Sequence, residues 1–167
     1  MKILPLLALL GLMSPLSAQP ARPPALPSEA RQFDFWLGDW EVTSPDGKTA
    51  GTSRIERVAG GAGLLENWSG AGGFTGKSLN TYQAEKKAWR QFWVGSDGGV
   101  LELAGGIVQG RMVLAGEQAG PGGRIAQRIT WTPNAGGTVR QLWEQSSDGG
   151  KTWTTVFDGL YRPRKTG

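Results

Sequence analysis

Residues 33–42 read Phe-Asp-Phe-Trp-Leu-Gly-Asp-Trp-Glu-Val, and the Gly-Asp-Trp triplet at 38–40 marks the start of a series of short strands. Just before it, Ser28 followed by an acidic residue predicts a short helix over residues 28–36. Serine caps a helix N-terminus, and an acidic side chain complements the helix dipole. The stretch 33–37 is too apolar for a free linker. We therefore expect it to pack over one end of the domain that follows.

Downstream of the triplet, Gly-Gly and Asp-Gly pairs separate short apolar and aromatic runs. The sequence holds 27 glycines and eight tryptophans, which is typical of many tight turns between many strands. We expect strands at residues 39–44, 49–58, 64–69, 77–84, 89–94, 100–104, a short one between Gly106 and Gly110, then 111–117, 124–132, 139–146 and 152–161. The connections are too short for crossover helices, so the sheet should be antiparallel and wound in sequence order.

The predicted fold class is all-β, as an antiparallel, up-and-down β-barrel of about ten strands with a short N-terminal helix. So many strands in one small domain would leave exposed edges, and closure into a barrel removes them. A two-sheet sandwich is the alternative architecture.

The first 18 residues have the features of a secretory signal peptide. Lys2 supplies the positive start, an apolar run follows, and Ser17-Ala18 offers small residues for cleavage. An uncleaved anchor is the competing interpretation, although the run is shorter than the roughly 20 apolar residues that span a bilayer. We therefore expect a secreted or periplasmic protein with no membrane span in the mature chain.

After the predicted signal, residues 19–28 form a Pro-rich lead-in that we expect to be extended or disordered. Residues 29–165 should then form a single domain, which is long enough to bury a substantial core.

Several kinds of chemistry are excluded by what the sequence lacks. The 167 residues contain no histidine and no cysteine. Disulfides, thiol nucleophiles, histidine-based triads and the usual zinc sites are therefore ruled out. The formal net charge is only +4 and the positive residues are scattered, so we expect no nucleic-acid partner. We also expect no cofactor and no metal.

The stretch 33–42 resembles the opening of an uncharacterised family of secreted bacterial proteins, and the resemblance runs to about residue 162. The triplet at its end is similar to the G-x-W signature of the calycin superfamily, which includes lipocalins, fatty-acid-binding proteins, avidins and nitrobindins. This resemblance implies a calycin-like barrel in which Gly38 and Trp40 open the first strand and Trp40 closes one end. It also implies that Arg162, after the last strand, lies over Trp40. The missing histidine argues against haem binding of the nitrobindin kind.

Residues 146–153 are similar to the Asp-box, S-x-D-x-G-x-T-W. In sialidases and related propellers this box is a hairpin turn remote from catalysis. The resemblance implies structural roles here, with Asp148 capping the turn through local hydrogen bonds and Trp153 packing beneath it.

Strand alternation predicts a set of side chains that could line a cavity. Residues 90–93 (Arg-Gln-Phe-Trp) are echoed at 140–143 (Arg-Gln-Leu-Trp), so the two segments should present the same face. The candidate lining mixes aromatic and polar groups, as ligand pockets do: Glu66, Trp68, Asn80, Tyr82, Gln91, Trp93, Arg128, Gln141, Trp143 and Glu144. The second echo has one extra turn residue, so either Trp143 or Glu144 faces inward. A core filled by these aromatics is the alternative to a cavity.

Three functions are compatible with this pattern. The favoured one is binding of a small, partly apolar ligand inside the barrel. The second is an envelope interaction module that exposes Phe33, Phe35 and Trp36. The third is a carboxylate-dependent hydrolase or isomerase that uses inward glutamates from among Glu66, Glu102 and Glu144. No catalytic residue is identifiable, which favours a binding protein over an enzyme.

Overall fold

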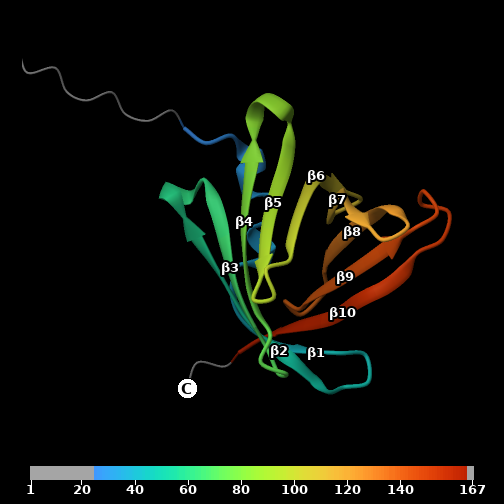
Figure 1. Cartoon of the computed structure of the whole chain (residues 1–167). Helices are drawn as coiled ribbons and strands as arrows, with labels where there is room; N and C mark the ends of the chain where they lie inside the picture. Colours follow the sequence, from blue (N-terminus) through green and yellow to red (C-terminus); the bar gives the residue numbers. More distant parts are fainter. Residues whose placement is uncertain (1–24, 165–167) are drawn as a thin grey trace, which may run out of the picture.

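Ten antiparallel strands follow one another around a closed ring in the computed structural model, which describes residues 25–164 (Figure 1). The predicted signal at 1–18 and most of the lead-in at 19–28 lie outside these residues. The strands are β1 (Gly38–Thr43), β2 (Thr49–Val58), β3 (Gly63–Gly70), β4 (Thr75–Gln83), β5 (Ala88–Gly95), β6 (Val100–Val108), β7 (Arg111–Gly120), β8 (Gly123–Pro133), β9 (Val139–Ser146) and β10 (Thr154–Pro163). Four short 3₁₀ turns accompany them, namely η1 (Ser28–Arg31), η2 (Asp34–Trp36), η3 (Ala59–Gly61) and η4 (Ala84–Lys86).

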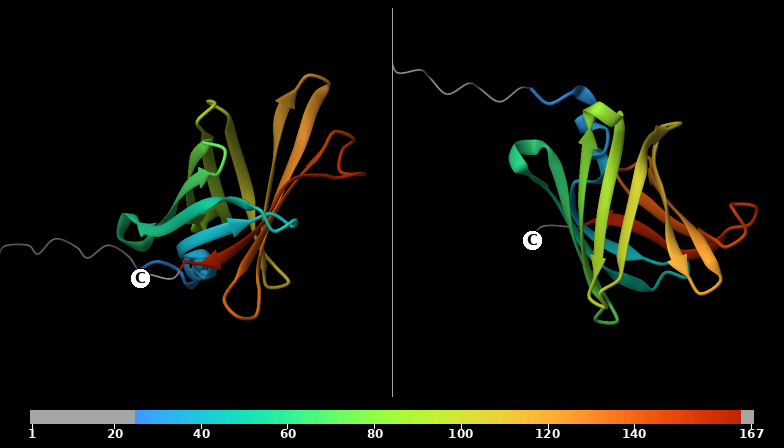
Figure 2. Two further views of the ribbon diagram at one scale, coloured as in Figure 1. Left: turned by 90° about the horizontal axis from the view of Figure 1, so that it is seen from below. Right: turned by 45° about the horizontal axis from the view of Figure 1, so that its top comes forward.

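The ring closes where the first strand meets the last. β1 pairs with β10 in the register Val42 opposite Tyr161, and the two strands run side by side in the left view of Figure 2. Every other ladder joins strands that are consecutive in the sequence. The prediction of an antiparallel up-and-down barrel is therefore confirmed, and the sandwich alternative is wrong. Among residues 25–164, no helix has the length and apolar character needed to cross a membrane.

One predicted strand boundary is wrong. Residues 100–104 and the short segment after Gly106 were expected as separate strands, but β6 runs through both glycines without a break. The reason is close packing, because a Cβ at Gly105 would overlap the carbonyl oxygen of Val113 on β7. Among the described residues, the β6–β7 ladder covers only Ala104–Val108 of β6, so the first half of β6 is paired with β5 alone.

The predicted N-terminal helix is present as two 3₁₀ turns, η1 and η2, rather than one continuous helix. Ser28 does not cap it, because its hydroxyl donates to the neighbouring Glu29 carboxylate. The apolar stretch packs inward as expected, with Phe33 and Trp36 completely buried. The interaction surface predicted from Phe33, Phe35 and Trp36 is therefore wrong, since two of these side chains are inaccessible and Phe35 is half-buried against the core.

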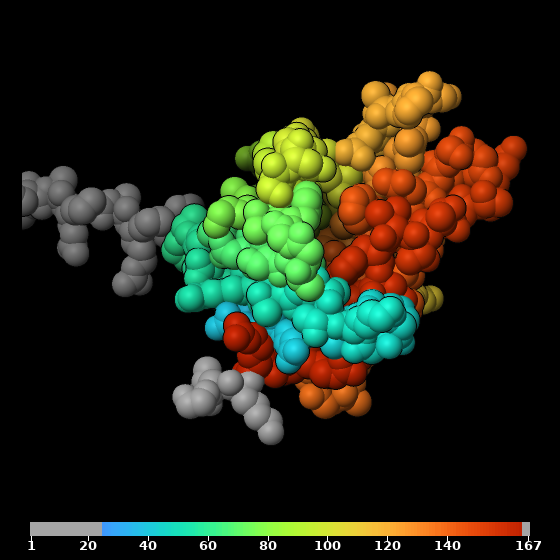
Figure 3. Space-filling view, turned by 60° about the horizontal axis from the view of Figure 1, so that its bottom comes forward, coloured from blue at the N-terminus to red at the C-terminus, as the bar shows by residue number. Residues whose placement is uncertain are grey.

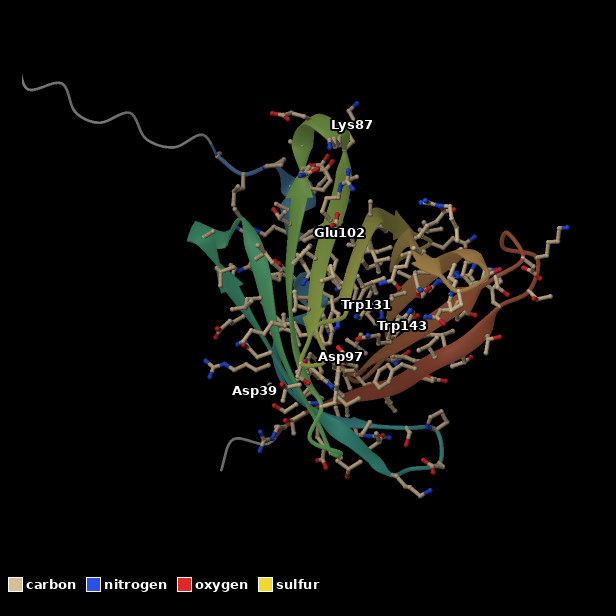
Figure 4. All side chains as sticks on the ribbon, in the orientation of Figure 1. Asp39, Lys87, Asp97, Glu102, Trp131 and Trp143 are labelled. Atoms are coloured by element: carbon tan, nitrogen blue, oxygen red, sulfur yellow. The ribbon has the colours of Figure 1, made fainter. Side chains whose placement is uncertain are left out.

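Because successive strands run in opposite directions, their connecting loops gather at the two ends of the barrel. Lys87 and Asp97, labelled in Figure 4, lie just before and just after β5 and mark these two ends. The end that holds η1, η2 and the start of β1 is here called the closed end. Its aromatic side chains interlock, with the Phe33 ring stacked on Trp36 at 4.9 Å between centroids and edge-on to Trp89 and Trp131 at 5.6 and 5.1 Å. Trp36 lies against Tyr161, so the rings of Phe33 and Trp36 together contact side chains of β5, β8 and β10.

Trp40 belongs to the closed end, but its predicted partner does not reach it. Trp40 is buried, and its indole N–H donates to the carbonyl oxygen of Trp36 at 2.9 Å. Arg162 is exposed on the outer face of β10 and donates to the Thr43 hydroxyl at 2.6 Å. The neighbouring Tyr161 takes the inward position instead, because alternate residues of a strand point to opposite faces. The expected packing of Arg162 over Trp40 is thus wrong.

Candidate functional site

The opposite end, called the open end, contains a cavity of about 340 Å³. It extends into the barrel between the β3–β4 loop and the β9–β10 side, and Figure 3 shows a hollow between the green and red segments there. The cavity is lined by Ala50, Glu66, Trp68, Gly70, Ala71, Gly72, Phe74, Gln91, Trp93, Leu101, Ile129, Gln141, Trp143, Phe157 and Tyr161. Its volume falls within the range of small-molecule sites, which are mostly apolar with a few polar groups.

Six of the ten predicted lining residues meet in this cavity: Glu66, Trp68, Gln91, Trp93, Gln141 and Trp143. The two echoed segments do present the same face, since Gln91 and Trp93 lie across the cavity from Gln141 and Trp143. Trp143 pairs with Ile129, and both face inward. The extra residue of the second echo follows Trp143 within residues 144–146, so it leaves the facing of Gln141 and Trp143 unchanged.

Indole rings form much of the cavity wall near its mouth. The Trp68 ring lies edge-on to Phe157 at 5.7 Å between centroids. The Trp93 ring lies over Gly76 on the neighbouring strand, where a Cβ would overlap it. Trp143 is held by its N–H, which donates to the Gln127 side-chain oxygen at 2.7 Å. These side chains are half-buried, so their faces remain available on the cavity side.

Deeper in the barrel, Glu66 is buried with 3 % of its surface exposed. The hydroxyls of Ser53 and Ser78, on the strands to either side, donate to its two oxygens at 3.1 and 2.9 Å. Burial raises the pKa of Glu66 from 4.5 to about 7, although both hydrogen bonds act in the opposite direction. This carboxyl therefore changes its charge near neutral pH.

A hydrogen-bonded row continues from Ser78 across β4 and β5. Asn80 is completely buried and donates to the Ser78 hydroxyl at 2.9 Å. Gln91 donates to the Asn80 oxygen, also at 2.9 Å. The row orients Gln91 in the cavity wall. Asn80 does not line the cavity itself, but it holds the Gln91 side chain by accepting its hydrogen bond.

The facing wall is organised by Gln141. Its side-chain oxygen accepts from the Tyr161 hydroxyl at 2.6 Å and from the Trp131 indole at 3.0 Å. Figure 4 labels Trp131 and Trp143 between the two walls of the barrel. Burial, with a smaller contribution from the Glu66 charge, holds the pKa of Tyr161 well above its usual value, so this phenol stays neutral.

Besides Asn80, the other three predicted lining residues lie outside the cavity. Tyr82 packs against Trp89 toward the closed end. Arg128 and Glu144 point out of the barrel, where the guanidinium donates to the carboxylate at 2.9 Å and covers the Trp153 ring at 3.9 Å. The expectation that Arg128 neutralises an inward glutamate is therefore wrong. Both positions alternate with inward neighbours on β8 and β9, so their side chains must face solvent.

The turn at 146–153 is held by Asp148. One of its oxygens accepts from the Ser146 hydroxyl at 2.7 Å and from the backbone N–H of Lys151 and Thr152 at 2.9 Å, and the other from the Thr152 hydroxyl at 2.6 Å. These bonds hold the pKa of Asp148 far below its usual value. The Trp153 indole donates to the Gly150 carbonyl at 3.1 Å, so all these contacts serve the loop itself.

The predicted carboxylate chemistry lacks its second carboxyl. Of the three glutamates considered, Glu66 faces the interior, whereas Glu102 and Glu144 lie on the outer face. Within residues 25–164, no group of three or more acidic side chains is placed to hold a metal ion. The cavity therefore has one carboxyl, that of Glu66, in its described lining.

Some cavity residues were missed by sequence reasoning. The cavity is also lined by inward-facing side chains of β6, β8 and β10, namely Leu101, Ile129, Phe157 and Tyr161. Period-2 alternation assigns each of them to one face of its strand but does not say that this face is the inner one, and the contribution of the Gly70–Gly72 loop to the cavity has no signal in the sequence. Comparison of the chain with known protein families and with curated proteins finds no match.

Proposed function

We propose that this barrel binds a small, partly apolar ligand in the cavity at its open end. The observation that carries the proposal is the cavity itself, about 340 Å³ with indole walls and the side chains of Glu66, Gln91 and Gln141. Apolar walls supply the driving force by burying ligand surface, and a few fixed polar groups set its orientation.

The two ends of the barrel support one direction of entry. At the closed end Phe33 and Trp36 are completely buried and packed against Trp89, Trp131 and Tyr161, which favours entry from the other end. The open end is bordered by the short-side-chain loop Gly70–Gly72, which leaves room at the mouth. The signal-like segment 1–18 supports a working location outside the cytoplasm, where such a container would meet diffusible molecules.

The test is binding of a neutral aromatic probe, 1-aminoanthracene, followed by its fluorescence and by tryptophan quenching. We expect saturable binding that Leu101→Trp abolishes, because the larger side chain occupies the cavity from β6. Val100→Trp is the matched control, since Val100 is the outward neighbour on the same strand and its replacement should leave binding unchanged. Equal loss in both variants, or no saturable binding by the unaltered protein, would overturn the proposal.

A further inference from the structure

The polar side of the cavity carries one sign of charge. Glu66 is the one charged side chain among the described residues that line it, and no lysine or arginine reaches the lining. This is unexpected for a chain with a net charge of +4. A carboxylate buried without a cation is unfavourable, and two serine hydroxyls compensate only part of its lost hydration. Because Glu66 lines the cavity, a cation inside the cavity could supply the counter-charge that the protein lacks there.

The aromatic residues lie where they would flank such a counter-charge. Glu66 on β3 is opposite Ser78 on β4, which is opposite Trp93 on β5, so these three form one row of the barrel wall. Trp68 lies two residues beyond Glu66 on the same face and is opposite Gly76. Because Gly76 has no side chain, the Trp93 ring extends over it toward Trp68. The two indoles therefore border the approach to the carboxyl from the open end.

From this arrangement we infer that the ligand is an organic cation, a quaternary or protonated amine on an apolar body, whose positive group lies between the indoles and Glu66. This inference rests on the proposed function and names the ligand class for that same cavity. Indole faces attract ammonium groups strongly, especially where water is displaced, and the carboxylate supplies the opposite charge. Anionic ligands such as fatty acids are disfavoured, because the lining offers no basic residue.

Protonation provides a second signature of the same contact. The carboxyl of Glu66 must be ionised to pair with a permanent cation, and its pKa is about 7. The other titratable side chain in the described lining is Tyr161 on β10, whose raised pKa keeps it neutral throughout. Ser53 and Ser78, which face Glu66 from β2 and β4, do not titrate. Affinity for a quaternary ammonium should therefore fall as the pH falls through 7.

The experiment compares three probes of one shape class on the full chain: benzyltrimethylammonium, its neutral isostere neopentylbenzene, and anionic phenylacetate. Tryptophan fluorescence and calorimetry give the dissociation constants at pH 8.5 and 5.5. At pH 8.5 we expect the ammonium to bind at least about tenfold more tightly than either other probe. Its affinity should drop by about eightfold at pH 5.5, because only about 3 % of a group with that pKa stays ionised there and the protonated carboxyl should bind the ammonium about tenfold less tightly, as a glutamine would.

Two variants separate the carboxylate from general effects. Glu66→Gln should lower ammonium affinity at pH 8.5 by about tenfold, remove its pH dependence and leave neopentylbenzene binding unchanged. Glu144→Gln, on the outer face, is the matched control and should change nothing. If Glu66→Gln fails to fold, Ser78→Ala keeps the test open, since loss of one donor should move the midpoint of the pH dependence upward.

The outcomes distinguish this inference from the proposed function. If neopentylbenzene or phenylacetate binds as tightly as the ammonium at pH 8.5, the cation assignment is wrong while the binding cavity stands. An unchanged ammonium affinity in Glu66→Gln has the same meaning. If none of the three probes and no 1-aminoanthracene binds, the proposed function fails as well.

Discussion

Both ends of the barrel are rich in aromatic side chains, and they use them in opposite ways. At the closed end, Phe33, Trp36 and Trp131 are fully buried and in contact with one another. At the open end, Trp68 and Trp143 are half-buried and border a cavity. The difference arises from the segment before β1, which supplies rings that are buried inside one end, whereas Phe74, the ring that the glycine-rich β3–β4 loop supplies at the other end, stays exposed beside the cavity. Aromatic content alone thus does not distinguish a core from a binding site.

The largest expected effect is on the filled end. Trp36→Ala should lower the free energy of unfolding by about 3–5 kcal/mol, because it removes a completely buried indole and leaves a cavity among its neighbours. Phe157→Ala at the open end is the counterpart and should cost only about 1 kcal/mol, because that ring is half-buried beside existing empty space. Urea unfolding followed by circular dichroism measures both. Similar losses in the two variants would contradict the distinction between the ends.

The next effect concerns the pH dependence of stability. Below about pH 4.5 Glu66 is protonated in both the folded and the unfolded chain. Between 4.5 and about 7 the unfolded chain releases this proton and the folded barrel retains it, so rising pH favours unfolding. The contribution of Glu66 should therefore fall by about 3 kcal/mol across that interval and stay constant above it.

Urea unfolding from pH 4 to 8 checks this effect against Glu66→Gln, which cannot titrate. Burial also raises the pKa of Asp34 at the closed end, so the difference between the two proteins, rather than either curve alone, isolates Glu66. A constant difference from pH 4 to 8 would show that the carboxyl is not buried as described.

The smallest effect on stability sharpens the description of the open end. Gly76→Ala should cost only about 1 kcal/mol, because the Trp93 ring that overlaps the new methyl group can rotate away from β4. That rotation directs the indole into the cavity, so binding of 1-aminoanthracene should be lost. Gly106→Ala on β6 is the control, since a Cβ there meets nothing and Gly106 does not line the cavity, so both stability and binding should be preserved. Retained binding in Gly76→Ala would show that Trp93 does not form the wall.

Much of the fold followed from local signals. Glycine pairs and Asp-Gly pairs identified nearly every turn, and short connections determined the order of the strands. The pair Gly105-Gly106 has the sequence of a turn and so predicts two strands where β6 is continuous, whereas the close approach of β7 is the reason for the glycine at 105. A glycine required by a neighbouring strand and a glycine required by a turn are identical in sequence.

The site was predicted less completely, for a physical reason. Alternation along one strand identifies side chains that share a face, as it did for Gln91 and Trp93, but not which face is inside. Arg128 and Glu144 were therefore placed inside, although they form an ion pair on the surface. The network around Glu66 joins residues from four strands, so it depends on registers that sequence periodicity does not encode.

The short ladder between β6 and β7 has a dynamic consequence. A closed ring normally protects its backbone amides from exchange with solvent, because opening one strand requires breaking bonds on both sides. Among the described residues, the first half of β6 is bonded on the β5 side alone, with the Gln118 side chain reaching across to the Val100 carbonyl. This seam runs along the cavity side of the barrel toward its mouth. Amide protons there should exchange with deuterium earlier than those of the β3 and β4 walls, and a bound molecule should slow them.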